Sequence, residues 1–248
     1  MPDKLIIFDY SGTLSPAMAA FGASDNLACY LKESGLQEIG IKDNNHFWNV
    51  VNEIWPEGSL TKAGYAGTLQ NHLFKLFPAT GKMKIKNAVD SFAAAYFSTS
   101  VIDDGWRNTL EKLSRDENSL VVIATDSYAE TTKTIIRNLS QWRIKAVRVG
   151  AKTASNFIVA NSADIGADKK DRLFWNKIRT VCPAGIKKIL LIDDFGAAEP
   201  QGDAYGQKKK IAERRKKTVA LLTAVFGVPV RLAPAANLTS KNFVSLLF

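Results

Sequence analysis

Acidic, hydroxyl and basic side chains adjoin short apolar runs at several points of this sequence. Asp9, Thr125 and the pair Asp193–Asp194 each come directly after such a run, and the pair Lys169–Lys170 precedes the last one. A carboxylate nucleophile, a hydroxyl, an ammonium group and further carboxylates are the groups needed for phosphoryl transfer through an aspartyl-phosphate. The residue types therefore predict phosphoryl transfer, provided that the fold brings them together.

Each of these side chains has a separate role in that chemistry. Asp9 is the candidate nucleophile, and because a dianionic phosphate repels a carboxylate, a divalent cation must lie between them. Asp9, a backbone carbonyl and one of the pair Asp193–Asp194 supply oxygen ligands of the kind that magnesium prefers. Thr125 and a lysine would hold the phosphoryl oxygens. Gly12 would let backbone amides close around the phosphate.

The apolar runs are continuous rather than alternating, which is typical of strands with helices on both faces of a parallel sheet. Helical segments lie between the later runs, so the sequence predicts a doubly wound, Rossmann-like α/β sheet. Ligands bind at the carboxyl ends of the strands in such a sheet. The predicted strands are Leu5–Phe8, Leu120–Ala124, Ala146–Val149, Ile189–Ile192 and, more weakly, Val228–Ala233. The predicted helices are Trp106–Asp116, Ala129–Trp142, Lys169–Val181 and Tyr205–Gly227.

One long stretch between the first strand and Trp106 contains no convincing strand. It predicts helices separated by glycine and proline breakers. These helices are Asn26–Ser34, Asn45–Trp55, Leu60–Phe77 and Lys84–Phe97. We therefore expect an all-helical cap domain at residues 16–100, inserted into a core domain formed by residues 1–15 and 101–248.

The chain of 248 residues carries a net charge of +9, which favours acidic partners such as phosphorylated small molecules or nucleic acid. Much of this charge lies in residues 207–217, "QKKKIAERRKK", either as the solvated face of a helix or as a phosphate-backbone contact. Two isolated cysteines and no signal-peptide pattern favour a cytoplasmic protein. No apolar run approaches the roughly 20 residues of a membrane span, so no membrane partner is expected.

The ordered motifs resemble those of the haloacid dehalogenase (HAD) superfamily over essentially the whole chain. "FDYSGTL" resembles the first motif, Thr125 the second, "KKDRLFW" the third and "DD" at Asp193–Asp194 the fourth. The resemblance implies a magnesium-dependent phosphohydrolase with Lys169, rather than Lys170, at the reaction centre. It implies metal ligands on Asp9, Asp193, Asp194 and the backbone carbonyl of Ser11. The candidate phosphate-binding residues are Gly12, Thr13, Asp126 and Lys170.

Ser11 departs from the pattern, because phosphatases of this family usually carry a second aspartate there as acid and base. Three interpretations stay open: a phosphatase that needs good leaving groups or another acid, a different reaction on the same nucleophile, or an impaired protein that only binds phosphate or nucleic acid. A phosphonatase-like reaction would need a Schiff-base lysine from the cap, and a dehalogenase would need an aromatic residue at position 11. The candidate lysines are Lys62, Lys75, Lys82, Lys84 and Lys86.

Overall fold

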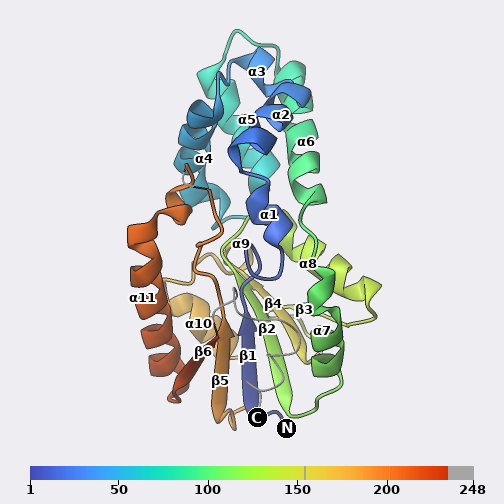
Figure 1. Cartoon of the computed structure of the whole chain (residues 1–248), viewed down its shortest axis with the longest axis vertical. Helices are drawn as coiled ribbons and strands as arrows, with labels where there is room; N and C mark the ends of the chain where they lie inside the picture. The colour runs from blue at the N-terminus through green and yellow to red at the C-terminus, as the bar shows by residue number, and fades with distance from the viewer. Residues whose placement is uncertain (154, 201, 234–248) are drawn as a thin grey trace.

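The structure is a computed structural model, which describes residues 1–153, 155–200 and 202–233. A parallel sheet flanked by helices forms one part of the molecule, and a group of helices extends beyond the carboxyl ends of its strands (Figure 1). We call this group, α1 to α6, the helical segment. Residues 234–248, which the sequence assigns to the core domain, lie outside the described residues.

The sheet has six strands in the order β3-β4-β2-β1-β5-β6, and all neighbouring strands pair in parallel. The doubly wound α/β fold predicted from the sequence is therefore confirmed. The strands are β1 (Lys4–Phe8), β2 (Ser119–Thr125), β3 (Val147–Arg148), β4 (Phe157–Asn161), β5 (Lys188–Ile192) and β6 (Val230–Ala233).

Strand β4 was not predicted from the sequence. It lies between β2 and β3 and is buried along its whole length, because it pairs on both sides. Its apolar stretch covers only Phe157–Ala160, directly after a polar loop, and so gives a short signal. The predicted run Ala146–Val149 is an edge strand with only two paired residues.

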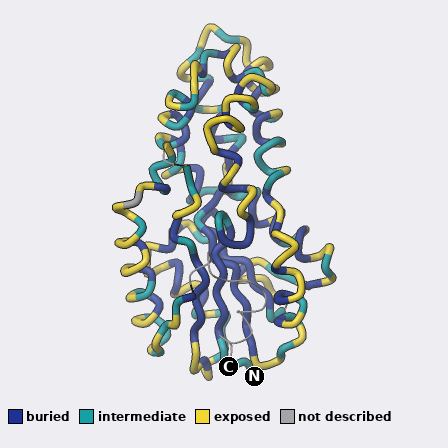
Figure 2. Tube along the Cα trace, viewed as in Figure 1, coloured by how far each residue is buried: buried dark blue, intermediate teal, exposed yellow. Residues whose placement is uncertain are grey.

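Alternate side chains of β1 enter two separate apolar clusters, as the period of two along a strand requires. Ile6 and Phe8 belong to a cluster on one face of the sheet, and Leu5 and Ile7 belong to a cluster on the other. The central strands are largely buried in Figure 2, and β2 and β4 are buried along their whole length. The helices that complete this part are η1 (Asp104–Trp106), α7 (Arg107–Ser114), α8 (Glu130–Gln141), α9 (Ser162–Ile165), α10 (Arg172–Arg179), η2 (Ala204–Gly206) and α11 (Lys208–Phe226).

The helical segment contains the four predicted helices, with shifted ends, and two short helices that the sequence pattern did not indicate. These six are α1 (Pro16–Ala20), α2 (Ser24–Glu33), α3 (Leu36–Ile39), α4 (Asn44–Gly58), α5 (Gly64–Leu76) and α6 (Lys82–Ser98). The segment has an apolar cluster of its own, which Tyr128 joins from the loop after β2. Because α1 and α3 have at most five residues each, they show no full helical period in the sequence.

Helix α10 begins later than predicted. The carboxylate of Asp171 accepts a hydrogen bond from the backbone N–H of Leu173 and caps the helix at Arg172. Lys169 and Lys170 therefore lie in the preceding loop, and the prediction that they open the helix was wrong.

The two cysteines, Cys29 and Cys182, are both free thiols. None of the helices in the described part of the chain is long and apolar enough to span a bilayer.

Candidate active site

The ends of the central strands bring three carboxylates together. Asp9 follows β1, and Asp193 and Asp194 follow β5, which pairs with β1. One oxygen from each carboxylate lies within 4.8 Å of the others. Asp9 and Asp193 are buried, so their charges are held close together away from water. Such an arrangement needs positive charge nearby.

Lys169 supplies part of that charge from the loop before α10. Its Nζ donates to Asp9 Oδ1 at 2.7 Å and to Asp193 Oδ2 at 2.9 Å, and its side chain is buried. Burial by itself would lower the pKa of Lys169, but the carboxylates of Asp193 and Asp9 raise it well above its usual value. Lys169 is therefore a buried ammonium group held between two strand ends.

The three carboxylates still outnumber this single ammonium group. Burial raises the pKa of Asp9 well above its usual value, and the charges of Asp193 and Asp194 add to that effect against the opposing charge of Lys169. The cluster is therefore short of positive charge. Its ligand atoms are all carboxylate oxygens, which suit magnesium, so the residues present fit the expected ion.

The loop after β1 folds tightly against the fourth motif. Gly12 has a φ of +74°, and a Cβ atom there would lie 2.6 Å from Asp194 Oδ2. Only glycine fits this close approach without strain. The hydroxyl of Thr13 donates to Asp194 Oδ1 at 3.4 Å and accepts from the backbone N–H of Asp194 at 3.1 Å. Gly12 and Thr13 therefore fix the position of Asp194.

Asp126 and Lys170, which were predicted to bind phosphate, lie outside the cluster of three carboxylates. Asp126 Oδ1 accepts a hydrogen bond from the backbone N–H of Lys169 at 2.9 Å, so this side chain holds the lysine loop. Lys170 is exposed and pairs with Asp168 at 3.0 Å, away from the cluster. Thr125 is buried at the end of β2 and lines the same cavity as Asp9 and Ser11.

Ser11 has a partner that the sequence did not indicate. Its Oγ donates to Glu199 Oε1 at 2.6 Å, across 188 positions of sequence. Burial, with the nearby charge of Asp203, raises the pKa of Glu199 to about 7. Glu199 lines the cavity that also contains Asp9, Ser11, Thr125 and Asp194, which we call the reaction cavity. A carboxyl group is therefore present beside position 11, although residue 11 is not acidic.

Arg214 was also missed, because it lies in the basic stretch at residues 207–217. Its side chain is buried, and its guanidinium donates to the carbonyl oxygens of Phe195 and Tyr205. Phe195 has a φ of +57°, an unusual conformation for a bulky residue, directly after the fourth motif. Arg214 thus holds the turn that follows Asp193 and Asp194.

Tyr205 connects this turn to the lysine loop. The guanidinium carbon of Arg214 lies 3.9 Å from the centre of the Tyr205 ring, and the Tyr205 hydroxyl donates to Asp126 Oδ2 at 3.3 Å. Since Asp126 holds Lys169, the chain of contacts from Arg214 to Lys169 is continuous. Arg214 lies among six other cations at residues 207–217, so no local signal separates it from solvated neighbours.

Comparison with solved structures identifies the fold. A HAD family enzyme of Bacteroides thetaiotaomicron aligns with 98% of this chain and 99% of its own, at 14% identity and a TM-score of 0.54. A variant of that enzyme, solved with magnesium and inorganic phosphate, aligns with 98% of this chain and 100% of its own, at 13% identity and a TM-score of 0.50. No protein-family model and no curated sequence matches the chain. The chain therefore has the fold of the HAD superfamily.

Proposed function

We propose that the protein is a magnesium-dependent hydrolase of phosphate monoesters that acts through a phosphorylated Asp9. The observation that carries this proposal is the contact of Lys169 with both Asp9 and Asp193, because Asp9 also lines the reaction cavity together with Thr125 and Ser11. The B. thetaiotaomicron enzyme that shares the fold was solved with magnesium and phosphate, which is consistent with it. The substrate is a phosphorylated small molecule.

In this mechanism Asp9 attacks phosphorus, and the bond from phosphorus to the leaving oxygen breaks. Lys169 engages Asp9 Oδ1, which leaves Oδ2 as the attacking oxygen. Lys169 and Thr125 hold the phosphoryl oxygens as charge develops on them. Asp9, Asp193, Asp194 and the carbonyl of Ser11 would hold magnesium, which neutralises the charge on the phosphate when it is bound. Water then attacks the acyl phosphate, restores the Asp9 carboxylate and releases phosphate.

Ser11 itself cannot act as acid or base near neutral pH, because a serine hydroxyl is far too weak an acid. In this proposal Glu199 carries out those proton transfers, since its carboxyl group contacts Ser11 at 2.6 Å and lines the reaction cavity. It protonates the leaving oxygen in the first step and takes a proton from water in the second. This corresponds to the interpretation in which another acid replaces the usual aspartate.

We also propose that the helical segment is a cap domain, at residues 16–100, over a core formed by the rest of the chain. Its separate apolar cluster supports this division. A phosphonatase-like reaction receives less support, because the lysines considered for it are all exposed. These are Lys62, Lys75, Lys82, Lys84 and Lys86.

An assay with p-nitrophenyl phosphate and acetyl phosphate tests the proposal. We expect hydrolysis in the presence of magnesium, its loss on chelation with EDTA, and a loss of at least about 10⁴-fold in Asp9→Asn. Asp25→Asn, an exposed acid in the first turn of α2, is the matched control and should retain full activity. Activity that is independent of magnesium, or that survives in Asp9→Asn, would exclude the proposed mechanism.

A further inference from the structure

A second cavity adjoins the reaction cavity, between the helical segment and the loop that follows β5. The two cavities share one wall, which is formed by Met18, Trp55, Tyr96, Glu199 and Asp203. Its volume is about 60 Å³. This exceeds the roughly 10–15 Å³ that a single water needs, so the cavity has room for a small organic group. We call it the aromatic cavity.

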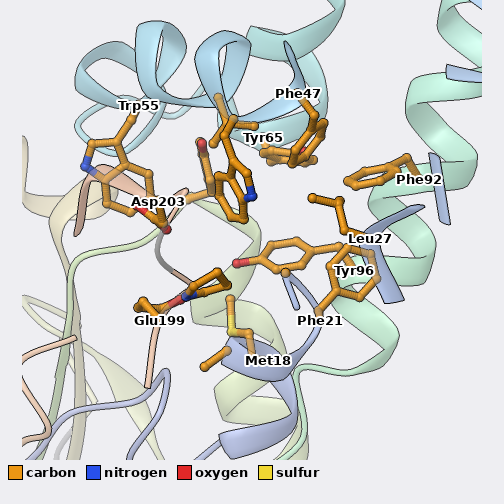
Figure 3. Close-up of a pocket in the computed structure, with 16 residues that line it drawn as sticks. Met18, Phe21, Leu27, Phe47, Trp55, Tyr65, Phe92, Tyr96, Glu199 and Asp203 are labelled. Carbon is orange, nitrogen blue, oxygen red and sulfur yellow. The ribbon is translucent and has the colours of Figure 1, made fainter. Parts of the chain in front are cut away.

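Aromatic rings form most of its wall and come from different elements. In Figure 3, Phe47, Trp55, Tyr65 and Phe92 of the helical segment surround one side of the space. Tyr128 approaches from the loop after β2, with its ring centre 5.2 Å from that of Trp55 and 4.8 Å from that of Tyr65. These rings meet edge to face, and aromatic rings carry a negative face that can attract a cation.

The only charged groups in this wall, among the described residues, are acidic. Glu199 and Asp203 line the cavity, and no lysine, arginine or histidine does. This contrasts with the chain as a whole, whose net charge is +9. Neither carboxylate forms an ion pair within the described part of the chain. Burial also raises the pKa of Asp203 above its usual value, although the hydrogen bond from the backbone N–H of Tyr205 and the charge of Arg214 oppose that effect.

Tyr128 adds an independent observation. Its hydroxyl is buried, and it has no hydrogen-bond partner among the described residues. A buried hydroxyl without a partner is costly, so a ligand atom in the cavity would relieve that cost. The hydroxyl oxygen can accept a hydrogen bond from an N–H group, and it can lie against a methyl group on a positively charged nitrogen.

The loop that carries both acids is attached to the helical segment. Asn52 of α4 donates to the carbonyl oxygen of Gly202 at 3.2 Å and accepts from the backbone N–H of Ala204 at 3.1 Å. Gly202 lies against Trp48, where a Cβ atom would lie only 2.3 Å from a ring carbon. This attachment holds Asp203 against the aromatic wall.

We propose that the aromatic cavity binds an organic ammonium group, and that the substrate is the phosphate monoester of an amino alcohol. Aromatic faces with acidic groups and no basic ones recognise such cations. A trimethylammonium group, with three methyl groups around a nitrogen, matches the size of the cavity. The ester's phosphate would lie in the adjoining reaction cavity, so the inference rests on the proposed function.

A matched pair of esters tests the inference. Phosphocholine and 3,3-dimethylbutyl phosphate have the same shape, but only the first carries a positive charge. We expect the wild-type protein to have a kcat/KM about tenfold higher for phosphocholine. In Asp203→Asn this ratio should fall below about threefold, because the neutral amide removes the charge that favours the cation. Asp25→Asn removes an exposed charge elsewhere and should keep the wild-type ratio.

Direct binding separates the inference from the proposed function. Trp48 and Trp55 line the cavity, so their fluorescence reports its occupation. We expect tetramethylammonium chloride to change the emission of the wild-type protein, whereas tert-butanol at the same concentration and ionic strength should not. Asp203→Asn should weaken this response, and its thermal melting curve would show whether the variant is folded.

Three outcomes are distinguishable. Hydrolysis of p-nitrophenyl phosphate without preference for phosphocholine over its neutral analogue would overturn the inference and leave the proposed function standing. Binding of tetramethylammonium without any magnesium-dependent hydrolysis would support the cation site and reject the proposed function. Stronger binding of tert-butanol or phenol than of tetramethylammonium would assign the cavity to a neutral group and overturn the inference.

Discussion

The reaction cavity and the aromatic cavity lie side by side, yet the chain builds them in different ways. Asp9, Asp193 and Asp194 follow strands and Thr125 ends β2, so the sheet itself brings them together. The rings of the aromatic cavity instead come from helices and loops spread over the helical segment and the sheet. The chemical groups are thus specified locally, whereas the shape that would select a substrate depends on how distant segments pack.

Two acids of the segment after the fourth motif, Glu199 and Asp203, line both cavities. Glu199 contacts Ser11 on the side of the reaction cavity, and Asp203 lines the wall that the helical segment covers. Because both acids line both cavities, separable effects are expected for residues that line only one of them, such as Thr125 in the reaction cavity and Phe92 in the aromatic cavity. Changes in the reaction cavity should lower turnover of every ester, while changes in the aromatic cavity should alter the preference between esters.

The largest effect within the reaction cavity, after loss of Asp9, is expected for Lys169→Met. The variant removes the ammonium group between Asp9 and Asp193 and should lower kcat by about 10²- to 10³-fold. Lys170→Met is the matched control, because Lys170 is exposed and pairs only with Asp168. Steady-state kinetics with p-nitrophenyl phosphate measure both. Equal losses in the two variants would show that Lys169 has no special role.

Glu199→Gln should have an effect that depends on the leaving group. The amide can still accept the hydrogen bond from Ser11 but cannot donate a proton as a carboxylic acid does. We expect about a 10²-fold loss of kcat on an alkyl phosphate and a much smaller loss on p-nitrophenyl phosphate, whose leaving group needs no acid. Equal losses on both esters would contradict the assigned role.

Ser11→Asp provides a complementary test of the same position. The new carboxylate would lie against Glu199, and two adjacent carboxylates cannot both be charged without cost. The single variant should therefore gain little activity on alkyl phosphates, whereas Ser11→Asp combined with Glu199→Gln should exceed Glu199→Gln alone by about tenfold or more. Rates of phosphate release from an alkyl phosphate, measured for Ser11→Asp, Glu199→Gln and the double variant, test this expectation.

Gly12→Ala should lower the free energy of unfolding by about 1–3 kcal/mol, because it forces a side chain into a left-handed backbone conformation against Asp194. Gly67→Ala is the control, since a Cβ atom at this position in α5 meets nothing within 4 Å. That substitution should stabilise the helix by about 0.5–1 kcal/mol. Urea unfolding measures both changes. If Gly12→Ala left the free energy of unfolding unchanged, the loop would be less tightly packed than the structure indicates.

The smallest effect on stability is expected for Tyr128→Phe, which removes only the buried hydroxyl without a partner. Stability without ligand should stay within about 0.5 kcal/mol of wild type or rise slightly. Activity on an ethanolamine phosphate ester should fall by about tenfold, because the variant loses a hydrogen bond from a charged ammonium group, which is worth about 1.5 kcal/mol or more. Unchanged kinetics on that ester would place the hydroxyl away from the ligand.

The sheet and the acidic cluster could be predicted from the sequence because their signals are local. The run Leu5–Phe8 is apolar and continuous, and Asp9 follows it directly, so strand and functional residue occur together. Asp193 likewise follows the apolar run Ile189–Ile192 directly, and this pattern located the carboxyl end of β5. Strand β4 was missed because its signal is short and lies beside an edge strand of only two residues.

Glu199, Asp203 and Arg214 could not be predicted, because their surroundings exist only in the folded chain. Arg214 is one of several cations in a row, and only the helix packing turns it inward to Phe195. Glu199 becomes relevant through one contact with Ser11, far away in sequence. One interpretation left open at Ser11, a phosphatase that uses another acid, allowed for such a carboxyl group but did not locate it.

Trapping the phosphorylated protein tests the assignment of Asp9 most directly. The protein would be incubated with magnesium and acetyl phosphate, quenched in acid, and digested for mass spectrometry of the peptide that contains Asp9. We predict an added phosphoryl group on Asp9 that is labile to hydroxylamine, absent from Asp9→Asn and retained in Asp25→Asn. Turnover of the ester with no phosphoryl group on Asp9, or with the same label in Asp9→Asn, would show that the reaction does not proceed through this carboxylate.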